Sequence, residues 1–326
     1  MKIAVYSPNW IGDSVLALPF IKALKTRYPK AKVYMFCKDW VSDIYKNHPD
    51  IDDIISVQNA TLESFIGTIK CGFRLRKIKL DYFFTLTDSF RSALVLRVSG
   101  SSKTIGYTSQ MRSFLLTNSR SKSKLTVHRS KKYLALLSDY EKLKIRPYLY
   151  ISPSEEKWGL KEMKKMGMDE PIGLFPFSVS NNRTIPKSTI IKWIQNSQSD
   201  YLVFGSKNDI QKGKHLINLG QKLSIQSICG KYTLRQSIIL ISLCKYALAA
   251  DSGLGHISAA LGVPTISFFG VGSLSVTGPI GKKVRIFEHC YPCKRDLCYI
   301  SNKEVFCLKK ISKQDTEHAV KKLTMK

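Results

Sequence analysis

The sequence predicts an α/β protein built from two doubly wound parallel-sheet domains that face a central cleft. Apolar runs of four to six residues alternate with longer helical patterns, which is typical of parallel sheets covered by helices. The alternation stops once, near the middle of the chain, and then resumes. The 326 residues also exceed the size at which one hydrophobic core usually keeps growing, so we expect two domains, at residues 1–150 and 151–326.

The first half predicts five strands joined by helical segments. The expected strands are residues 3–6, 32–37, 54–57, 82–86 and 104–107. The expected helices are residues 14–27, 41–47, 62–76 and 91–98. A polar, basic stretch at residues 108–130 then breaks the alternation and predicts a loop over a site. A helix at 131–144 follows, and a linker begins at Arg146.

The second half predicts another wound sheet. Its expected strands are residues 172–177, 201–204, 225–228, 246–250 and 265–269. Its expected helices are residues 187–196, 207–222, 234–243 and 257–261, the last ended by Gly262. Because open parallel sheets bind ligands at the carboxyl ends of their strands, the polar turns that follow these strands are the candidate sites.

One such turn, residues 249–256, reads Ala-Ala-Asp-Ser-Gly-Leu-Gly-His and opens a helix. We expect Asp251 or Ser252 to cap that helix, and the small residues leave its first backbone N–H groups accessible. The helix dipole favours an anion there, and His256 projects from the first turn beside it. The turn therefore predicts a phosphate site, although an ordinary capped crossover helix has the same local features.

The second such turn, residues 7–14, follows the first strand. Asp13 lies at the start of the next helix, where a carboxylate serves either as a general base or as a plain helix cap. Gly12 supports a tight turn in both cases. The motif is not G-x-G-x-x-G, which disfavours a dinucleotide site of the Rossmann type.

The formal net charge is +28, and half of it lies in about a quarter of the chain. Residues 70–146 hold eighteen Lys or Arg and four acidic residues, a net charge of +14. Such a field attracts nucleic acid, an anionic lipid surface or a phosphorylated acceptor, while a solvated lysine-rich surface accounts for the same excess. The N-terminus lacks the pattern of a signal peptide and no run of eighteen uncharged apolar residues occurs, so we expect a cytoplasmic protein.

The eight cysteines fall into two groups. Cys37, Cys71, Cys229 and Cys244 lie in or beside expected strands and helices and indicate reduced, buried thiols. The other four have the spacing C-x2-C-x4-C-x8-C, at Cys290, Cys293, Cys298 and Cys307. That spacing suits a tetrahedral structural Zn or Fe site remote from the reaction, and four thiols in a loop are the alternative.

Motifs along nearly the whole chain fit one known family. In the first half they are residues 9–13 with Pro19, and residues 88–94, 105–107 and 133–137. In the second half they are residues 183–186, 202–206 and 251–256. In this order they resemble the ADP-heptose:lipopolysaccharide heptosyltransferases of glycosyltransferase family 9. The resemblance implies a GT-B fold of two Rossmann-like domains, with the acceptor-binding domain first and the nucleotide-sugar-binding domain second.

The resemblance also implies roles for single residues. Asp13 matches the family's general base, which takes the proton of the acceptor hydroxyl as it attacks the anomeric carbon with inversion. Arg183 matches a cation on the donor diphosphate, and Ser178 matches a hydroxyl nearby. The residues that match the helix end holding the pyrophosphate and ribose are Asp251, Ser252, Gly253 and His256. The basic candidates for acceptor binding are Arg91, Lys103 and Arg112.

The implied enzyme transfers heptose from ADP-heptose to an inner-core lipopolysaccharide or lipooligosaccharide acceptor on lipid A, and needs no metal for the chemistry. We expect it to be cytoplasmic and peripheral at the anionic inner-membrane surface. Lys207 stands where some members carry an acidic residue on the ribose, which leaves Asp209 as a substitute. Two alternatives stay open: a family member with another nucleotide sugar, and a noncatalytic basic binder of anionic glycolipid or nucleic acid. No recognised nucleic-acid motif is present, so nucleic acid is not expected as a partner.

Overall fold

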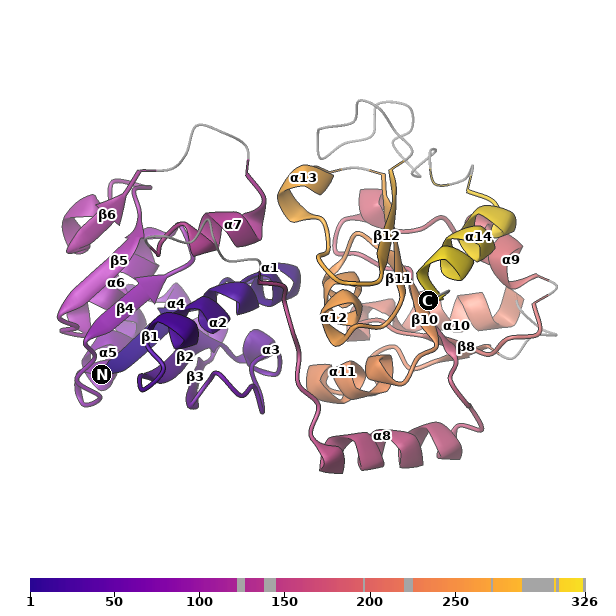
Figure 1. Ribbon diagram of the computed structural model, residues 1–326, viewed down its shortest axis with the longest axis horizontal. Coiled ribbons are helices and arrows are strands. Elements are labelled where there is room, and N and C mark those ends of the chain that lie inside the picture. The colour runs from indigo at the N-terminus through magenta and orange to yellow at the C-terminus, as the bar shows by residue number, and fades with distance from the viewer. Residues whose placement is uncertain are drawn as a thin grey trace. The chain divides into compact units, whose positions relative to one another are not determined.

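A computed structural model describes the chain except residues 122–126, 138–144, 196, 220–224, 271, 289–307, 309, 310, 325 and 326. The chain divides into two compact units, Met1–Tyr150 and Ile151–Lys326, and each is described by itself. Both units contain a six-stranded, fully parallel sheet, which confirms the predicted fold class (Figure 1). Among the described residues, no helix combines the length and the apolar character that crossing a bilayer requires.

The sheet of the first unit has the strand order β3-β2-β1-β4-β5-β6. Its strands are β1 (Lys2–Tyr6), β2 (Lys32–Lys38), β3 (Asp53–Val57), β4 (Tyr82–Thr85), β5 (Lys103–Tyr107) and β6 (Asn118–Arg120). Central β1 pairs with both β2 and β4, so that Val5 lies opposite Met35 and Phe84. Ile3, Ala4 and Val5 are fully buried because helices cover both faces of the sheet. The strand order reverses between β1 and β4, and this switch point is where such sheets bind ligands.

Helices of the first unit form two layers, one containing α2 and α7 and the other α5 and α6 (Figure 1). They are α1 (Ile11–Leu16), α2 (Leu18–Arg27), α3 (Asp39–Ser42), α4 (Asn59–Glu63), α5 (Phe65–Arg76), α6 (Phe90–Val98) and α7 (Arg129–Leu134). The helix predicted at residues 14–27 is in fact two helices that meet at Ala17. Pro19 in the first turn of α2 has no N–H to donate to the preceding turn, which explains the break.

The stretch at residues 108–130 is not wholly a loop, because it contains the 3₁₀ helix Ser113–Leu115 and strand β6. Tyr107 of β5 lies opposite Arg120 of β6 in a parallel pair. The prediction missed β6 because its three residues are polar and it is an edge strand that buries no apolar face. The helix predicted at residues 131–144 begins earlier, as α7, and its later residues lie outside the described part of the chain.

The sheet of the second unit has the order β12-β11-β10-β7-β8-β9, and its switch point lies between β7 and β10. Its strands are β7 (Ile172–Phe175), β8 (Tyr201–Val203), β9 (Ile225–Ser227), β10 (Tyr246–Ala250), β11 (Thr265–Phe269) and β12 (Val284–Glu288). Its helices are α8 (Pro153–Lys165), α9 (Lys187–Ile194), α10 (Ile210–Leu219), α11 (Leu234–Ser242), α12 (Gly253–Leu261), α13 (Leu274–Thr277) and α14 (Lys313–Thr324). Stacked Trp193 and Phe268, 4.6 Å between ring centroids, lie in the core cluster under α9.

Four helices and strands of this unit were not predicted, namely α8, α13, β12 and α14. Helix α8 begins at a capping box, in which the Ser152 side chain accepts from the Glu155 N–H and the Glu155 carboxylate accepts from the Ser152 N–H. The same carboxylate accepts a hydrogen bond from Arg235 Nε of α11 at 2.7 Å. This pair fixes the start of α8 on α11, and the Ser-x-x-Glu spacing was the signal in the sequence.

Candidate functional site

The first half of the candidate site lies at the switch point between β1 and β4. After β1 the chain turns through residues 7–10 into α1, whose N-cap is Trp10. Asp13 lies in the first turn of α1, and the Trp10 side chain makes no capping bond to a described residue. The carboxylate of Asp13 is therefore held at the carboxyl edge of the sheet without serving as the helix cap.

A buried hydroxyl network fixes the turn that carries Asp13. Ser7 Oγ lies 2.5 Å from the Tyr45 hydroxyl and donates to the Pro8 carbonyl at 2.9 Å. Ser14 Oγ, next to Asp13 in the chain, donates to the same carbonyl at 3.1 Å. Because these groups are buried and paired, the turn has one defined conformation. The position of Asp13 is thus set by the fold rather than by a flexible loop.

Two cations of α7 face Asp13. Arg129 Nε lies 3.6 Å from Asp13 Oδ1, and Lys132 Nζ donates to Asp88 Oδ2 at 2.8 Å. Burial raises the pKa of Asp13, while the charges of Arg129 and Lys132 lower it, and the net shift is upward. A carboxylate with a raised pKa is a stronger base than an exposed one, so the arrangement suits proton abstraction.

The three acceptor candidates lie in different environments. Arg91 is exposed in the first turn of α6, and its charge contributes to lowering the pKa of Lys38 at the end of β2, where burial is the largest cause. Lys103 is the first residue of β5, with Nζ 3.4 Å from the Tyr82 hydroxyl. Since β5 runs parallel to β1, Lys103 lies at the opposite edge of the sheet from Asp13. The structure therefore groups Arg91, but not Lys103, with the carboxyl edge.

Arg112 is fully buried, with a relative exposure of 0%. Its Nε donates to the Tyr107 carbonyl at 3.0 Å, and its Nη1 donates to the Ser89 carbonyl at 2.8 Å and to Ser92 Oγ at 3.0 Å. These bonds tie the segment after β5 to the start of α6. The environment supports an internal positioning role for this side chain, and its assignment to acceptor binding stays a prediction.

The second half of the candidate site lies at the other switch point, after β10 and β7. Helix α12 begins at Gly253 with Ser252 as N-cap, yet the Ser252 side chain makes no capping bond. Among the described residues, Ser252 Oγ is buried without a hydrogen-bond partner. Ser252 therefore occupies the predicted N-cap position, but its side chain does not make the expected capping bond. The first N–H groups of α12 lack a side-chain cap and suit an anionic ligand.

Asp251 connects β10 to the segment that follows β7. Its carbonyl accepts a hydrogen bond from Ser178 Oγ at 3.2 Å, and its Oδ2 lies 3.4 Å from Arg183 Nη1. Burial raises the pKa of Asp251 to about 6, against the opposing effect of Arg183. A Cβ added at Gly272, whose φ is +114°, would lie 3.3 Å from Asp251 Oδ2. Only glycine suits this position, where the backbone closes on the ion pair.

His256 lies in the first turn of α12 and is buried. The helix comes close to β10 because Gly255 has no side chain, and a Cβ there would lie 3.1 Å from that of Ala249. The structure therefore brings together the six predicted donor residues, Ser178, Arg183, Asp251, Ser252, Gly253 and His256. Their chemistry, several donors around a helix N-terminus, suits a diphosphate.

Comparisons with known proteins identify the family. Residues 69–304 match the model of glycosyltransferase family 9 (heptosyltransferase), which is more than half of the chain. The chain belongs to glycosyltransferase family 9. It is 27% identical over 309 residues to lipopolysaccharide heptosyltransferase 2 of Escherichia coli, covering 88% of each chain. It is 24% identical over 307 residues to lipooligosaccharide heptosyltransferase 2 of Haemophilus influenzae, again covering 88% of each.

Solved structures agree on the fold of this family 9 chain. Escherichia coli ADP-heptose lps heptosyltransferase II matches with a TM-score of 0.85 and 24% identity, covering 99% of this chain and 98% of that one. A family 9 glycosyl transferase from Veillonella parvula matches with a TM-score of 0.87 and 18% identity, covering 99% and 96%. The fold is therefore GT-B, and the predicted glycosyltransferase is confirmed.

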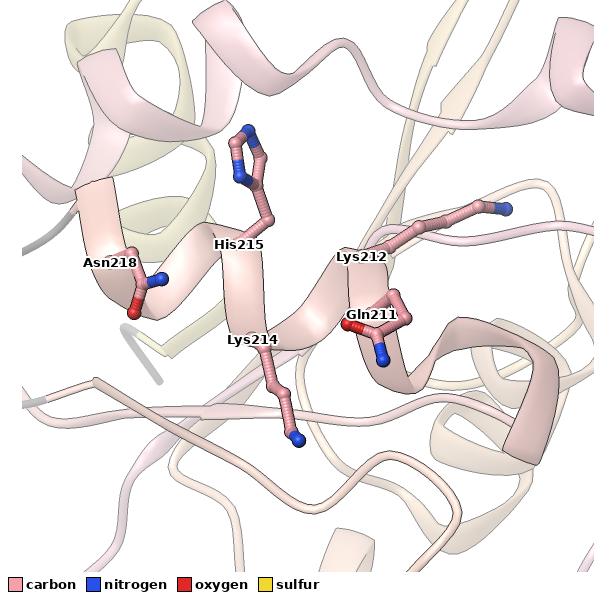
Figure 2. Close-up of a pocket in the computed structure, with 5 residues that line it drawn as sticks. All are labelled: Gln211, Lys212, Lys214, His215 and Asn218. Carbon is pink, nitrogen blue, oxygen red and sulfur yellow. The ribbon is translucent and has the colours of Figure 1, made fainter.

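Two hollows of the second unit are lined by residues other than the six donor candidates. An open hollow of about 510 Å³ is lined by side chains of α10, namely Gln211, Lys212, Lys214, His215 and Asn218. Figure 2 shows Lys214 and His215 pointing in different directions from the helix. A smaller pocket of about 290 Å³ lies between α9 and α10 and includes Thr184, whose Oγ1 accepts from the Ser178 N–H at 3.3 Å.

The substitute proposed for the ribose contact has another role. Asp209 Oδ2 accepts from the Ser206 N–H at 3.0 Å and from Ser206 Oγ at 2.6 Å, and Oδ1 lies 3.4 Å from Lys212 Nζ. Asp209 thus caps the 3₁₀ helix Lys207–Asp209, which its spacing from Ser206 would have predicted.

Sequence reasoning also missed two neighbours of Asp13 in the first half of the candidate site. Arg129 and Lys132 were part of an undifferentiated basic stretch, and only the fold of α7 brings them to Asp13.

The cysteine quartet, Cys290, Cys293, Cys298 and Cys307, lies outside the described residues, so its metal site stays a prediction. Within the described part of the chain, no group of three or more His, Cys, Asp or Glu is placed to hold a metal ion. The other four cysteines are buried and reduced, as predicted.

Proposed function

We propose that this family 9 enzyme transfers heptose from ADP-heptose to an inner-core lipopolysaccharide or lipooligosaccharide acceptor, with inversion at the anomeric carbon. The names of the relatives, lipopolysaccharide and lipooligosaccharide heptosyltransferase 2, support the sugar and the acceptor class. The observation that carries the proposal is Asp13, a mostly buried carboxylate with a raised pKa at the switch point of the first sheet.

Asp13 acts as the general base in this proposal. Its carboxylate takes the proton of the acceptor hydroxyl while that oxygen forms a bond to the anomeric carbon, and the bond from this carbon to the ADP oxygen breaks. The attack from the face opposite ADP inverts the centre. Arg129 and Lys132 limit the rise of the Asp13 pKa, which favours the ionised carboxylate that a base requires.

The donor half binds the diphosphate and stabilises the departing ADP. Backbone N–H groups of Gly253 and its successors, Ser252 Oγ and His256 offer hydrogen bonds at the start of α12. Arg183 supplies a planar, charged fork to the phosphate oxygens. Asp251, with a pKa of about 6, is readily protonated beside an anionic ligand, which reduces its repulsion of the diphosphate.

The acceptor and the place of action complete the proposal. Arg91, exposed at the carboxyl edge of the first sheet, binds an acidic sugar or phosphate of the lipid A core. Lys103 and Arg112 stay weaker acceptor candidates because of their positions. The enzyme works in the cytoplasm, on the inner-membrane surface, and its chemistry requires no metal; a Zn or Fe at the cysteine quartet would be structural.

A donor and acceptor screen tests this function. The full chain is incubated with a truncated lipid A core and with ADP-heptose, ADP-glucose or UDP-glucose, and the product is identified by mass. We expect an increase equal to one heptose with ADP-heptose alone. Transfer of a different sugar would replace the proposed donor, and no transfer together with tight binding of any DNA or RNA would favour the noncatalytic alternative.

A further inference from the structure

Helix α5 of the first unit has a buried face that packs on α6. Its buried residues are Thr68, Cys71, Gly72 and Leu75. A Cβ added at Gly72 would lie 2.6 Å from Val98 Cβ, so the two helices approach as closely as backbone allows. Arg76 Nε donates to the Val98 carbonyl at 2.8 Å at the end of the same contact. This face therefore has its partner within the unit.

A second face of α5, adjoining the buried one, is apolar and exposed. Phe65, Ile66 and Phe73 have relative exposures of 57%, 65% and 52%, and half-buried Ile69 lies between them. Residues 65, 69 and 73 are four positions apart, so their side chains form one line along the helix. We call Phe65, Ile66, Ile69 and Phe73 the outer face of α5. A run of exposed large apolar side chains of this kind marks an interaction surface.

Cations surround the outer face. Between Ser64 and Leu80 the chain carries five basic residues and no acidic one. The basic residues, all exposed, are Lys70, Arg74, Arg76, Lys77 and Lys79. Arg76 also lies over the Phe73 ring, 4.5 Å from its centroid. The helix thus combines an apolar line with positive charge on its borders, which is the pattern of helices that lie in a membrane interface.

We propose that the outer face of α5 docks the protein on an anionic phospholipid bilayer. The aromatic and aliphatic side chains enter the boundary between headgroups and acyl chains, and the five cations bind lipid phosphates. Charge complementarity selects this occupant. A nucleic acid would use the cations and leave Phe65 and Ile66 without a function, and an apolar protein groove would leave the cations unpaired.

The docking places the acceptor half of the site next to the bilayer. Helix α5 connects parallel strands β3 and β4, so it runs against them and its Phe65 end lies toward the carboxyl edge that carries Asp13. Glu63, just before α5, and Arg91 both act on the pKa of Lys38, which places that end beside the acceptor candidate. This role rests on the proposed function, because an acceptor anchored in lipid would reach Asp13 from the docked surface.

Vesicle flotation of the full chain tests the docking. Vesicles of phosphatidylglycerol with phosphatidylethanolamine are compared with vesicles of phosphatidylcholine alone. We expect the protein to float with the anionic vesicles and the triple variant Phe65→Ser/Ile66→Ser/Phe73→Ser to lose at least about 100-fold in partition coefficient. The variant Lys70→Gln/Arg74→Gln/Lys77→Gln should lose about 100-fold as well. The circular dichroism and thermal unfolding of both should match the parent, because these side chains are exposed.

Matched controls lie on α8, in the other unit. Exposed Lys157, Lys161 and Lys164 are changed together to Gln, which removes the same charge, and exposed Leu160 is changed to Ser. These controls should leave the vesicle partition coefficient within about 10-fold of the parent value. Charge removed away from the docking face changes only the net charge of the protein, whose effect on binding is small at physiological ionic strength. Equal losses in the α5 and α8 charge variants, or full vesicle binding by the serine variant, would overturn the proposal.

The same variants separate docking from chemistry. With a water-soluble core oligosaccharide as acceptor, the α5 variants should keep the kcat of the parent and lose rate only with lipid-anchored acceptor in anionic vesicles. Parent protein that transfers heptose but does not bind anionic vesicles overturns the docking and leaves the function intact. Parent protein that binds vesicles through α5 yet transfers no sugar overturns the proposed function alone. Binding of RNA that the serine variant retains would assign the cations to nucleic acid instead.

Discussion

Asp13 is subject to two opposing influences. Burial raises its pKa, and Arg129 and Lys132 lower it by a smaller amount. Both serve a general base: burial makes the carboxylate more basic, and the two cations favour its ionised form. The sequence suggested Asp13 from its place after a strand, but the two cations come from a helix more than one hundred residues later in the chain. No local pattern around Asp13 contains them.

Replacing the base should separate catalysis from donor binding. We expect Asp13→Asn to lower kcat about 1,000-fold and to leave the affinity for ADP unchanged, because amide oxygen does not take up the proton. In the parent, kcat/KM should fall as the pH drops through the raised pKa of Asp13, since only the ionised form is a base. Product mass assays and calorimetry measure the two quantities. Asp169→Asn, an exposed change in the other unit, is the control; full turnover by Asp13→Asn would remove the assignment.

Arg183 should act on donor affinity. Because its guanidinium is partly exposed beside Asp251 and the α12 end, we expect Arg183→Ala to weaken ADP binding about 10- to 100-fold, as measured by calorimetry. Arg183→Lys should recover part of that loss, since a point charge keeps the attraction but not the planar fork. Lys192→Ala, which removes an exposed cation of α9, should bind ADP like the parent. Unchanged affinity in Arg183→Ala would exclude contact with the diphosphate.

Asp251 gives a pH-dependent stability. Its pKa rises from 3.8 to about 6 on folding, so between these values the native state binds more protons than the unfolded state. The free energy of unfolding contributed by this group is therefore highest below pH 4 and is lost as the pH rises to about 6, by about 3 kcal/mol at most. Urea unfolding at several pH values should show this decline in the parent relative to Asp251→Asn. A constant difference between the two proteins across pH 4 to 7 would contradict the raised pKa.

At the scale of elements, apolar alternation predicted most strands and helices, because buried parallel strands need apolar residues on both faces. It failed where something other than burial decides. Polar β6 forms through its backbone pairing with β5. Pro19 in the first turn of α2 separates that helix from α1, and a capping box starts α8. The α12 turn was recognised from small residues after a strand, and Ser252 is its N-cap residue, but among the described residues the Ser252 hydroxyl makes no capping bond. Residue type predicts which residue occupies the N-cap position, but it does not show whether that side chain makes the capping bond.

Arg112 connects two elements, the end of β5 and the start of α6. Its three hydrogen bonds to Tyr107, Ser89 and Ser92 are buried, so we expect Arg112→Ala to lower the free energy of unfolding by about 3 kcal/mol, as measured in urea. Exposed Arg91→Ala, its matched control on the same helix, should change stability by less than about 0.5 kcal/mol and raise the acceptor KM instead. A fully stable Arg112→Ala with a raised acceptor KM would restore Arg112 to the acceptor site.

For the whole molecule, length and alternation were enough to predict two parallel sheets, and the contacts within the chain divide it at Tyr150. The positive charge required the structure for its interpretation. The sequence placed +14 within residues 70–146 without distinguishing its parts. The fold assigns Lys132 to the catalytic half, Arg112 to the interior, and Lys70, Arg74 and Lys77 to the borders of an exposed apolar face. Equal charges thus serve different purposes according to burial and neighbours.

The two units have different predicted roles, and this leads to a prediction for the whole chain. All predicted diphosphate contacts belong to Ile151–Lys326, and Asp13 belongs to Met1–Tyr150. Hydrogen exchange of the full chain, followed by mass spectrometry, should therefore show that ADP protects residues 178–184 and the first turn of α12. At an ADP concentration 100 times Kd, hydrogen exchange at backbone amides whose opening requires release of ADP should slow about 100-fold. The turn before α1 should exchange at the same rate as in the free enzyme. Protection confined to Met1–Tyr150 would assign the nucleotide to the other unit and reverse the roles of the two halves.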